Sequence, residues 1–196
     1  MTLSTILAFM TVTALLVISP GPNGVLIAKT VPTSGKLAGF ANIAGFVTAF
    51  YIHGAFVLFG LSVILMRSAE LFFLVKMLGA AYLCYIGLKA LVEAWQGGIA
   101  RPVAPARRRR TLDTAYAEGL LTNALNPKVS MFYIAAFPQF LPPDHATAGN
   151  IFVLVFLHSM INLVWFSAMV LLFASLSRFA RGGQAERWIK AATGLV

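Results

Sequence analysis

The stretch TILAFMTVTALLVISPGPNGVLIAKTV, residues 5–31, decides the fold class of this chain. It is apolar over roughly 20 residues or more, the length that a helix needs to cross the hydrocarbon core of a membrane. Ser19-Pro20-Gly21-Pro22-Asn23-Gly24 interrupts it. Proline has no backbone N–H to donate and glycine adds conformational freedom, so a helix should end here and restart with Pro22 near its first position. The stretch therefore predicts a membrane-spanning helix that is broken in its middle.

A half-helix that begins inside the membrane presents free backbone N–H groups and the positive end of its dipole to the interior. Here those groups belong to about Asn23 to Val25. This arrangement is suited to an anion such as the carboxylate of a small solute.

The composition of the whole chain agrees with a membrane protein. Its 196 residues are 59% hydrophobic and 11% charged, with a mean hydropathy of +0.84, which is more apolar surface than a soluble core of this size buries. A single cysteine, Cys84, excludes an intrachain disulfide, and no Cys/His spacing suggests a metal site. We expect an all-α integral membrane protein without a cofactor or a bound metal.

Six apolar segments predict six transmembrane helices in a single domain, residues 1–196. They are Thr2–Val31, Leu37–Leu65, Leu71–Trp95, Leu112–Phe140, Asn150–Leu176 and a last one that opens near Arg187. From Arg187 to Val196 a helix covers only about 15 Å, half of the hydrocarbon core. The last helix is therefore expected to be truncated.

Basic residues are concentrated in the odd-numbered connections between these segments. They include Lys29, Lys36, Arg101, the run Arg107 to Arg110, Arg178, Arg181, Arg187 and Lys190. The positive-inside rule then makes these loops cytoplasmic and places both termini in the periplasm of a bacterial inner membrane. We favour this reading of the net charge of +9 over a nucleic-acid site. Contact with anionic membrane lipids is compatible with it.

The two halves of the chain resemble each other. In the first, Pro20 and Pro22 precede a span that contains His53; in the second, Pro127 precedes a span that contains His158. A block of three spans reverses the direction of the chain across the membrane. Repeats of about 1–95 and 112–196, joined by a basic loop at about 96–111, would therefore be inverted relative to each other, as in many transporters.

The second break, Asn123-Ala124-Leu125-Asn126-Pro127-Lys128, repeats the device of the first. Asn126 is placed as a helix N-cap, Pro127 as the first helical residue, and Lys128 as a positive charge at mid-depth that needs water, a carboxylate such as Glu118, or a substrate. Prolines can also be simple packing kinks. Two matched breaks with polar residues at each favour a binding site.

Other polar residues in the spans have two readings. Glu118, His53 and His158 are the titratable groups that could carry an exchanged proton, although each histidine could equally hold helices together. Asn42 and Asn162 could line a cavity, although a structural role between helices is the stronger reading.

Several motifs resemble one bacterial family. They are Ser19 to Asn23, Leu78-Gly79-Ala80-Ala81-Tyr82-Leu83 with Tyr85-Ile86-Gly87-Leu88-Lys89, Asn126-Pro127-Lys128, and Phe137-Pro138-Gln139-Phe140. Together they resemble the LysE/RhtB family of inner-membrane exporters of amino acids such as lysine, arginine, homoserine, threonine and leucine, which are driven by the proton motive force. The resemblance implies a six-helix exporter in which Pro20, Gly21, Pro22, Asn23, Asn126, Pro127 and Lys128 belong to the translocation site.

Other classes of function fit the sequence less well. An intramembrane enzyme needs a nucleophile with a base, paired aspartates or metal ligands, and the spans contain none of these constellations. An exporter of metal cations would need a cluster of ligands that two separated histidines, one cysteine and at most one glutamate do not provide. A channel or a non-transporting membrane subunit stays an alternative, and the sequence leaves a homodimer open.

Overall fold

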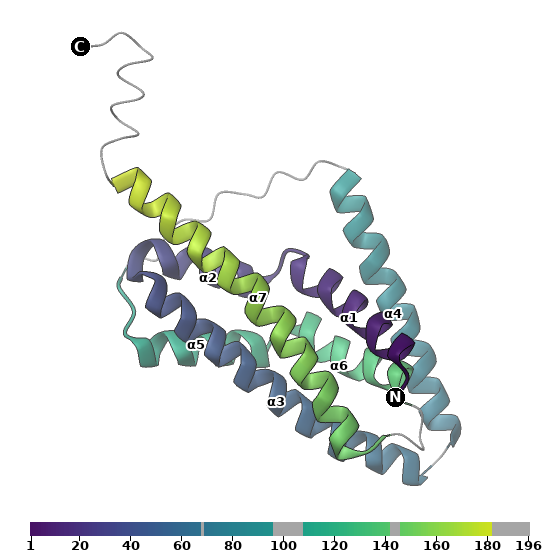
Figure 1. Ribbon diagram of the computed structural model, residues 1–196. Helices are drawn as coiled ribbons and strands as arrows, with labels where there is room; N and C mark the ends of the chain where they lie inside the picture. The colour runs from purple at the N-terminus through teal and green to yellow at the C-terminus, as the bar shows by residue number, and fades with distance from the viewer. Residues whose placement is uncertain (68, 96–107, 142–145, 182–196) are drawn as a thin grey trace, which may run out of the picture.

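Figure 1 shows the computed structural model, which describes residues 1–67, 69–95, 108–141 and 146–181. All regular structure in these ranges is helical, which confirms the predicted all-α class. The helices are α1 Leu3–Ile18, α2 Pro22–Ser34, α3 Lys36–Arg67, α4 Ala69–Trp95, α5 Leu112–Ala124, α6 Pro127–Phe140 and α7 Ala148–Arg181.

The first apolar segment is a bent pair of helices. α1 ends at Ile18, α2 begins with Pro22, and the two axes meet at 53°. Pro22 fits the first helical position because its missing N–H would have had no partner there. At the other end, Gly35 closes α2 with a φ of +86°, a conformation that a residue with a side chain rarely adopts. The predicted break is confirmed.

The fourth apolar segment is interrupted in the same way. α5 begins after Thr111, whose hydroxyl accepts a hydrogen bond from the Thr114 N–H, and ends at Ala124. α6 begins with Pro127, and the side chain of Asn126 accepts from the Lys128 N–H. Asn126 is therefore the N-cap that its position before Pro127 predicts. Each half of the chain thus opens with a broken pair and continues with a long helix, α3 or α7.

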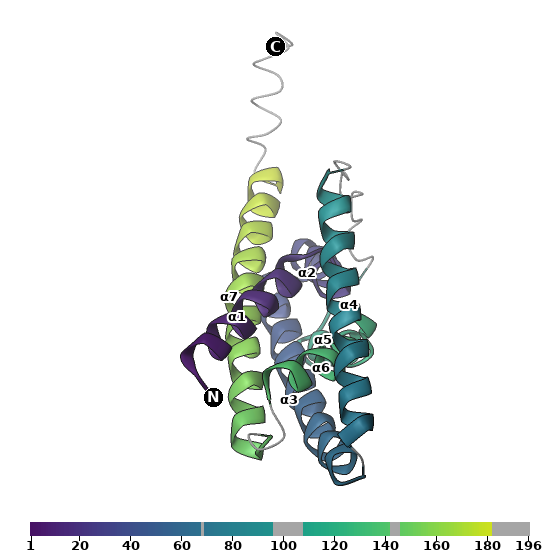
Figure 2. The ribbon, with the colours of Figure 1, turned by 90° about the vertical axis from the view of Figure 1, so that its right-hand side faces the viewer.

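The two long helices pack against each other and against the broken pairs. α3 contacts α5, α7 contacts α1 and α2, and α4 packs mainly on α6. In the view turned by 90° (Figure 2), α7 and α4 stand on opposite sides, and α1 crosses in front of α7. The core is rich in aromatic side chains, among them Phe9, Phe46, Phe50, Phe132 and Tyr133.

Length and apolar composition support two or three membrane spans among the described residues. Lys36–Gly60 and Ala148–Phe179 each qualify alone, and α1 with α2 qualifies as one bent span. α4 contributes a shorter apolar stretch, Phe73–Tyr85. The predicted sixth segment, which opens near Arg187, lies outside the described ranges, so the count of six spans stays a prediction.

Candidate functional site

A cavity of about 250 Å³ lies at the first helix break. Its walls are the end of α1, the start of α2 and one face of α7, with residues of α6 completing it. The polar side chains that line it are Ser19, Asn23, Asn126, Lys128, His158 and Asn162. Pro20, Gly21 and Gly24 contribute backbone, and Phe50, Trp165, Phe166, Met169 and Phe173 contribute apolar surface. Most of the predicted site residues thus share one cavity.

The side chain of Lys128, which belongs to the second break, reaches the first break with its ammonium group. Its Nζ donates to the Ser19 carbonyl oxygen at 2.9 Å and to the Ser19 hydroxyl. It also lies beside Gly21, where an added Cβ would be 3.7 Å from Nζ. These residues are more than a hundred positions apart in sequence. The two proline motifs therefore meet at one ammonium group.

The two helix starts differ in what they leave open. Helix geometry leaves the first N–H groups of any helix without an intrahelical partner. At α6, Asn126 caps them: its side chain accepts from the Lys128 N–H at 3.1 Å and its carbonyl from the Val129 N–H at 3.0 Å. At α2, the N-cap Gly21 has no side chain to offer, and its carbonyl accepts from the Val25 N–H at 3.2 Å. Within the described part of the chain, the N–H groups of Asn23 and Gly24 are therefore available to a ligand, whereas the N–H of Val25, which the sequence predicts to be free as well, is bonded.

Three residues that line the same cavity carry a buried polar atom without a partner. Asn23 Oδ1, Asn162 Oδ1 and His158 Nδ1 are buried and have no hydrogen-bond partner within the part of the chain that the structure describes. Buried polar atoms are usually paired, because an unpaired one costs roughly 1–3 kcal/mol. The three residues line the cavity while these atoms are covered by their neighbours, so a turn of the side chain would be needed to bring each atom to a bound solute.

Asn123 joins the two breaks from inside the wall. Its Oδ1 accepts from Asn23 Nδ2 at 2.9 Å, and its Nδ2 donates to the Phe46 carbonyl at 2.8 Å. The Asn123 carbonyl lies 3.5 Å from His53 Nε2. The structure gives this predicted site residue a bridging position and not one in the cavity lining. It fixes the side chain of Asn23, which does line the cavity.

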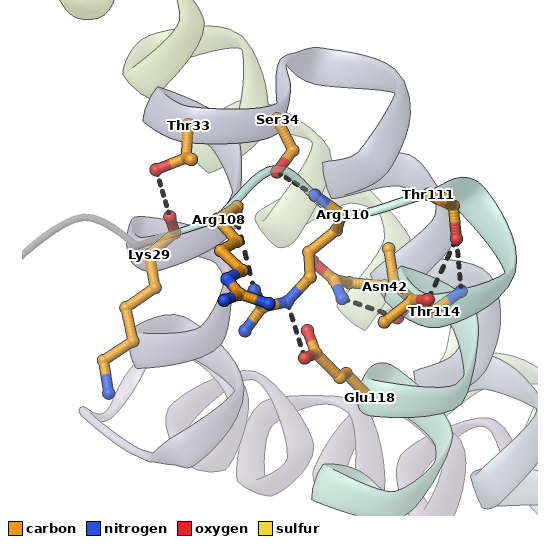
Figure 3. A network of polar contacts seen from close by, with 10 residues as sticks. Lys29, Thr33, Ser34, Asn42, Arg108, Arg110, Thr111, Thr114 and Glu118 are labelled. Carbon is orange, nitrogen blue, oxygen red and sulfur yellow. Dashed lines mark hydrogen bonds and ion pairs between the residues drawn. The ribbon is translucent and has the colours of Figure 1, made fainter.

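Two other predicted residues lie away from the cavity. The Asn42 amide donates to the Ala115 carbonyl at 2.6 Å and joins α3 to α5, as the structural reading of this residue proposes. Glu118 accepts from Arg110 Nε at 2.6 Å in a partly exposed ion pair, shown in Figure 3. The Arg110 N–H in turn donates to the Ser34 hydroxyl at 2.9 Å. The end of α2 and the start of α5 therefore lie at the same end of the molecule.

Sequence reasoning did not assign several lining residues. Ser19 stands inside the first proline motif, but its role as partner of Lys128 depends on a contact between the two halves. Trp165, Phe166, Met169 and Phe173 follow His158 and Asn162 at helical spacing on α7. That periodicity could have indicated a common face.

Comparison with known protein families matches residues 14–196 to the LysE type translocator family. The chain belongs to this family. Family membership makes it a membrane transporter and not an enzyme, which confirms the resemblance seen in the sequence. No solved structure matches the chain.

Curated relatives cover nearly the whole chain. The uncharacterized membrane protein YrhP of Bacillus subtilis is 27% identical, over 97% of this chain and 93% of its own length. The threonine efflux protein of Escherichia coli K12 is 28% identical over 87% of this chain and 82% of its own. The homoserine/homoserine lactone efflux protein of Salmonella typhimurium is 25% identical over 95% and 89%. This LysE-family chain is thus similar to proteins named for the efflux of small amino acids and their derivatives.

Proposed function

We propose that the chain is a secondary active exporter of amino acids or related zwitterionic metabolites across the bacterial inner membrane, driven by proton antiport. The observation that carries the proposal is the contact between the two breaks: the Lys128 ammonium and the uncapped start of α2 lie at one cavity that Asn23 and Asn162 also line. The names of the relatives support the same substrate class.

The donors at the break are suited to the carboxylate of the substrate. The N–H groups of Asn23 and Gly24 and the positive end of the α2 dipole favour an anion, and Lys128 adds a full charge beside them. A carboxylate at this point would lie beside an ammonium that also donates to the hydroxyl and carbonyl of Ser19. Charge-assisted hydrogen bonds of this kind are roughly twice as strong as neutral ones.

The amides of two lining asparagines suit the ammonium end of the same substrate. Asn23 and Asn162 line the cavity from α2 and α7, and a turn of either side chain would bring its buried, unpaired Oδ1 to the solute. Neither is charged, so together with Lys128 they favour a net-neutral zwitterion over a solute with an additional positive charge, which the lysine would repel. We therefore infer a neutral amino acid such as threonine or homoserine, the substrates in the relatives' names.

The topology predicted from the basic residues completes the proposal. The hydrogen bond from the Arg110 backbone N–H to Ser34 brings the end of α2 and the residues just before α5 to the same end, where Arg108 also lies. We propose that this end is cytoplasmic, that both termini are periplasmic, and that six spans form two inverted repeats. The exchanged proton is carried by one or more of Glu118, His53 and His158. His158 lines the cavity and Glu118 does not.

Counterflow in proteoliposomes tests the proposal. Liposomes containing the full chain are loaded in turn with each unlabelled amino acid, and uptake of the labelled form is followed. Because a carrier exchanges solute through a site that saturates, the wild type should accumulate labelled threonine or homoserine transiently. Lys128→Gln should reduce this accumulation at least tenfold, since the carboxylate loses its charged partner.

Lys29→Gln is the matched control, because Lys29 is an exposed lysine on α2 that lines no part of this cavity. It should leave counterflow unchanged. Equal losses in the two lysine variants would contradict the assignment of the site. A flux that never saturates would support a channel, and the absence of counterflow with every amino acid would support the reading of a non-transporting subunit.

A further inference from the structure

A second cavity, of about 420 Å³, lies between α3, α4 and α6. His53, Val57 and Gly60 line it from α3, Tyr133 and Ser130 line it from α6, and Val75 contributes from α4. Its walls share no residue with the cavity at the first break. Nothing in the proposed substrate site accounts for it.

The two cavities are built from equivalent positions of the two halves. An interval of 105 residues separates Pro22 from Pro127 and His53 from His158. The same interval relates six residues that line the first cavity to six that line the second: Ser19 to Ala124, Val25 to Ser130, Ala28 to Tyr133, and, in reverse, His158 to His53, Asn162 to Val57 and Trp165 to Gly60. Six of the ten residues that line the second cavity thus have an equivalent in the first, which indicates that the two cavities belong to a structural repeat.

The cavities extend toward opposite ends of the molecule. The first follows α2 and the later part of α7, to Ala28 and Phe173, toward the end where Ser34 meets Arg110. The second follows the later part of α3 and the later part of α6, to Gly60 and Pro138, and reaches Val75 near the beginning of α4. Figure 1 shows that these parts of α3 and α4 lie at the other end of the bundle from the last turns of α7.

A partition of aromatic rings separates the cavities. His158 and Phe50 line the first, with ring centroids 4.1 Å apart, and His53 and Tyr133 line the second, 5.2 Å apart. The rings of Tyr133 and His158 stack across the partition at 5.6 Å. Tyr133 is 1% exposed, and its hydroxyl has no hydrogen-bond partner among the described residues. The barrier is therefore two ring layers thick.

We propose that the two cavities are the inner and outer halves of a single translocation path, and that the ring of Tyr133 closes the path between them in this conformation. The first cavity has Ala28 at the equivalent position, so Tyr133 has no counterpart ring there. This path rests on the proposed function in one respect: a solute must cross the membrane through this chain. The outer half of the path is the second cavity, a binding vestibule whose lining is apolar apart from His53, Ser130 and Tyr133.

Thiol labelling at two equivalent positions tests the inference. In the full chain with Cys84→Ser, Val25→Cys places a thiol in the first cavity and Ser130→Cys places one in the second. A membrane-impermeant maleimide is applied to intact cells and to inverted membrane vesicles. Ser130→Cys should react from the outside, and Val25→Cys should react from the inside, each at least tenfold faster than from the other face. Reaction of both thiols from the same face would overturn the inference.

Two variants of Tyr133 test the barrier. Tyr133→Ala removes the ring and should make Val25→Cys react from outside at least tenfold faster than with Tyr133 present. Tyr133→Phe keeps the ring and should leave the two-sided pattern unchanged. If a folded Tyr133→Ala protein shows the same outside reactivity as the protein with Tyr133, the role of the ring is overturned. If Tyr133→Ala does not fold, the labelling patterns with Tyr133 intact and with Tyr133→Phe still decide whether the cavities open to opposite faces. Labelling requires no transport, so these results are independent of whether counterflow is observed.

Discussion

At the scale of single residues, Asn123 helps to set the position of the proposed substrate site without lining it. The Oδ1 of Asn123 accepts from the side chain of Asn23, and its Nδ2 donates to the Phe46 carbonyl. Phe46 lies within α3 and its carbonyl keeps a helical partner, but Asn23 Nδ2 depends on Asn123 and is buried. Loss of this contact therefore leaves the buried Asn23 Nδ2 donor without a hydrogen-bond partner beside the cavity.

Asn123→Ala should lower the free energy of unfolding by about 1–2 kcal/mol, because a buried amide donor loses its partner. Asn42→Ala is the matched control: it removes one amide bond to the Ala115 carbonyl, which remains bonded within α5. Thermal unfolding in detergent should place the midpoint of Asn123→Ala below that of Asn42→Ala. The reverse order would contradict the bridging role of Asn123.

At the scale of elements, the contact between α3 and α5 positions the second break against the first half of the chain. Glycines allow these two helices to touch through their backbones. A Cβ at Gly119 would lie 2.2 Å from the Asn42 carbonyl oxygen, and one at Gly45 would lie 2.3 Å from the Tyr116 carbonyl oxygen. Both are backbone atoms, so a side chain can be accommodated only if the helices separate.

Gly45→Ala should destabilise the protein by about 1–3 kcal/mol, because it forces this separation. Gly60→Ala is the control on the same helix: nothing lies within 4 Å of the added Cβ, and alanine is favoured over glycine in a helix by roughly 0.5–1 kcal/mol. Thermal unfolding in detergent should show a lower midpoint for Gly45→Ala and an unchanged or higher one for Gly60→Ala. Similar midpoints for the two variants would contradict the close contact.

At the scale of the whole molecule, local features were predictable and contacts between the halves were not. The breaks before Pro22 and Pro127 follow from the chemistry of proline, and the cap at Asn126 follows from its position. The pairing of Lys128 with Ser19 depends on how the two halves fold against each other.

The same limit applies to Glu118 and to Tyr133. The sequence offers Glu118 as a partner for Lys128, but in the folded chain Glu118 pairs with Arg110. Tyr133 has no motif around it, and only the positions of the two cavities distinguish it from the other core aromatic residues.

We propose that this molecule couples a zwitterion to protons through a single path, and transport driven by a pH gradient tests this coupling. Proteoliposomes with an acid lumen are placed in neutral medium with the labelled amino acid identified by counterflow. Protons leaving the lumen should drive the amino acid inward, to an internal concentration above the external one. The double variant His53→Gln, His158→Gln should keep counterflow but lose this accumulation, and Glu118→Gln should keep both, since Glu118 lies outside the cavities. An amino acid that equilibrates but never accumulates, or accumulation that survives substitution of all three residues, would contradict the account.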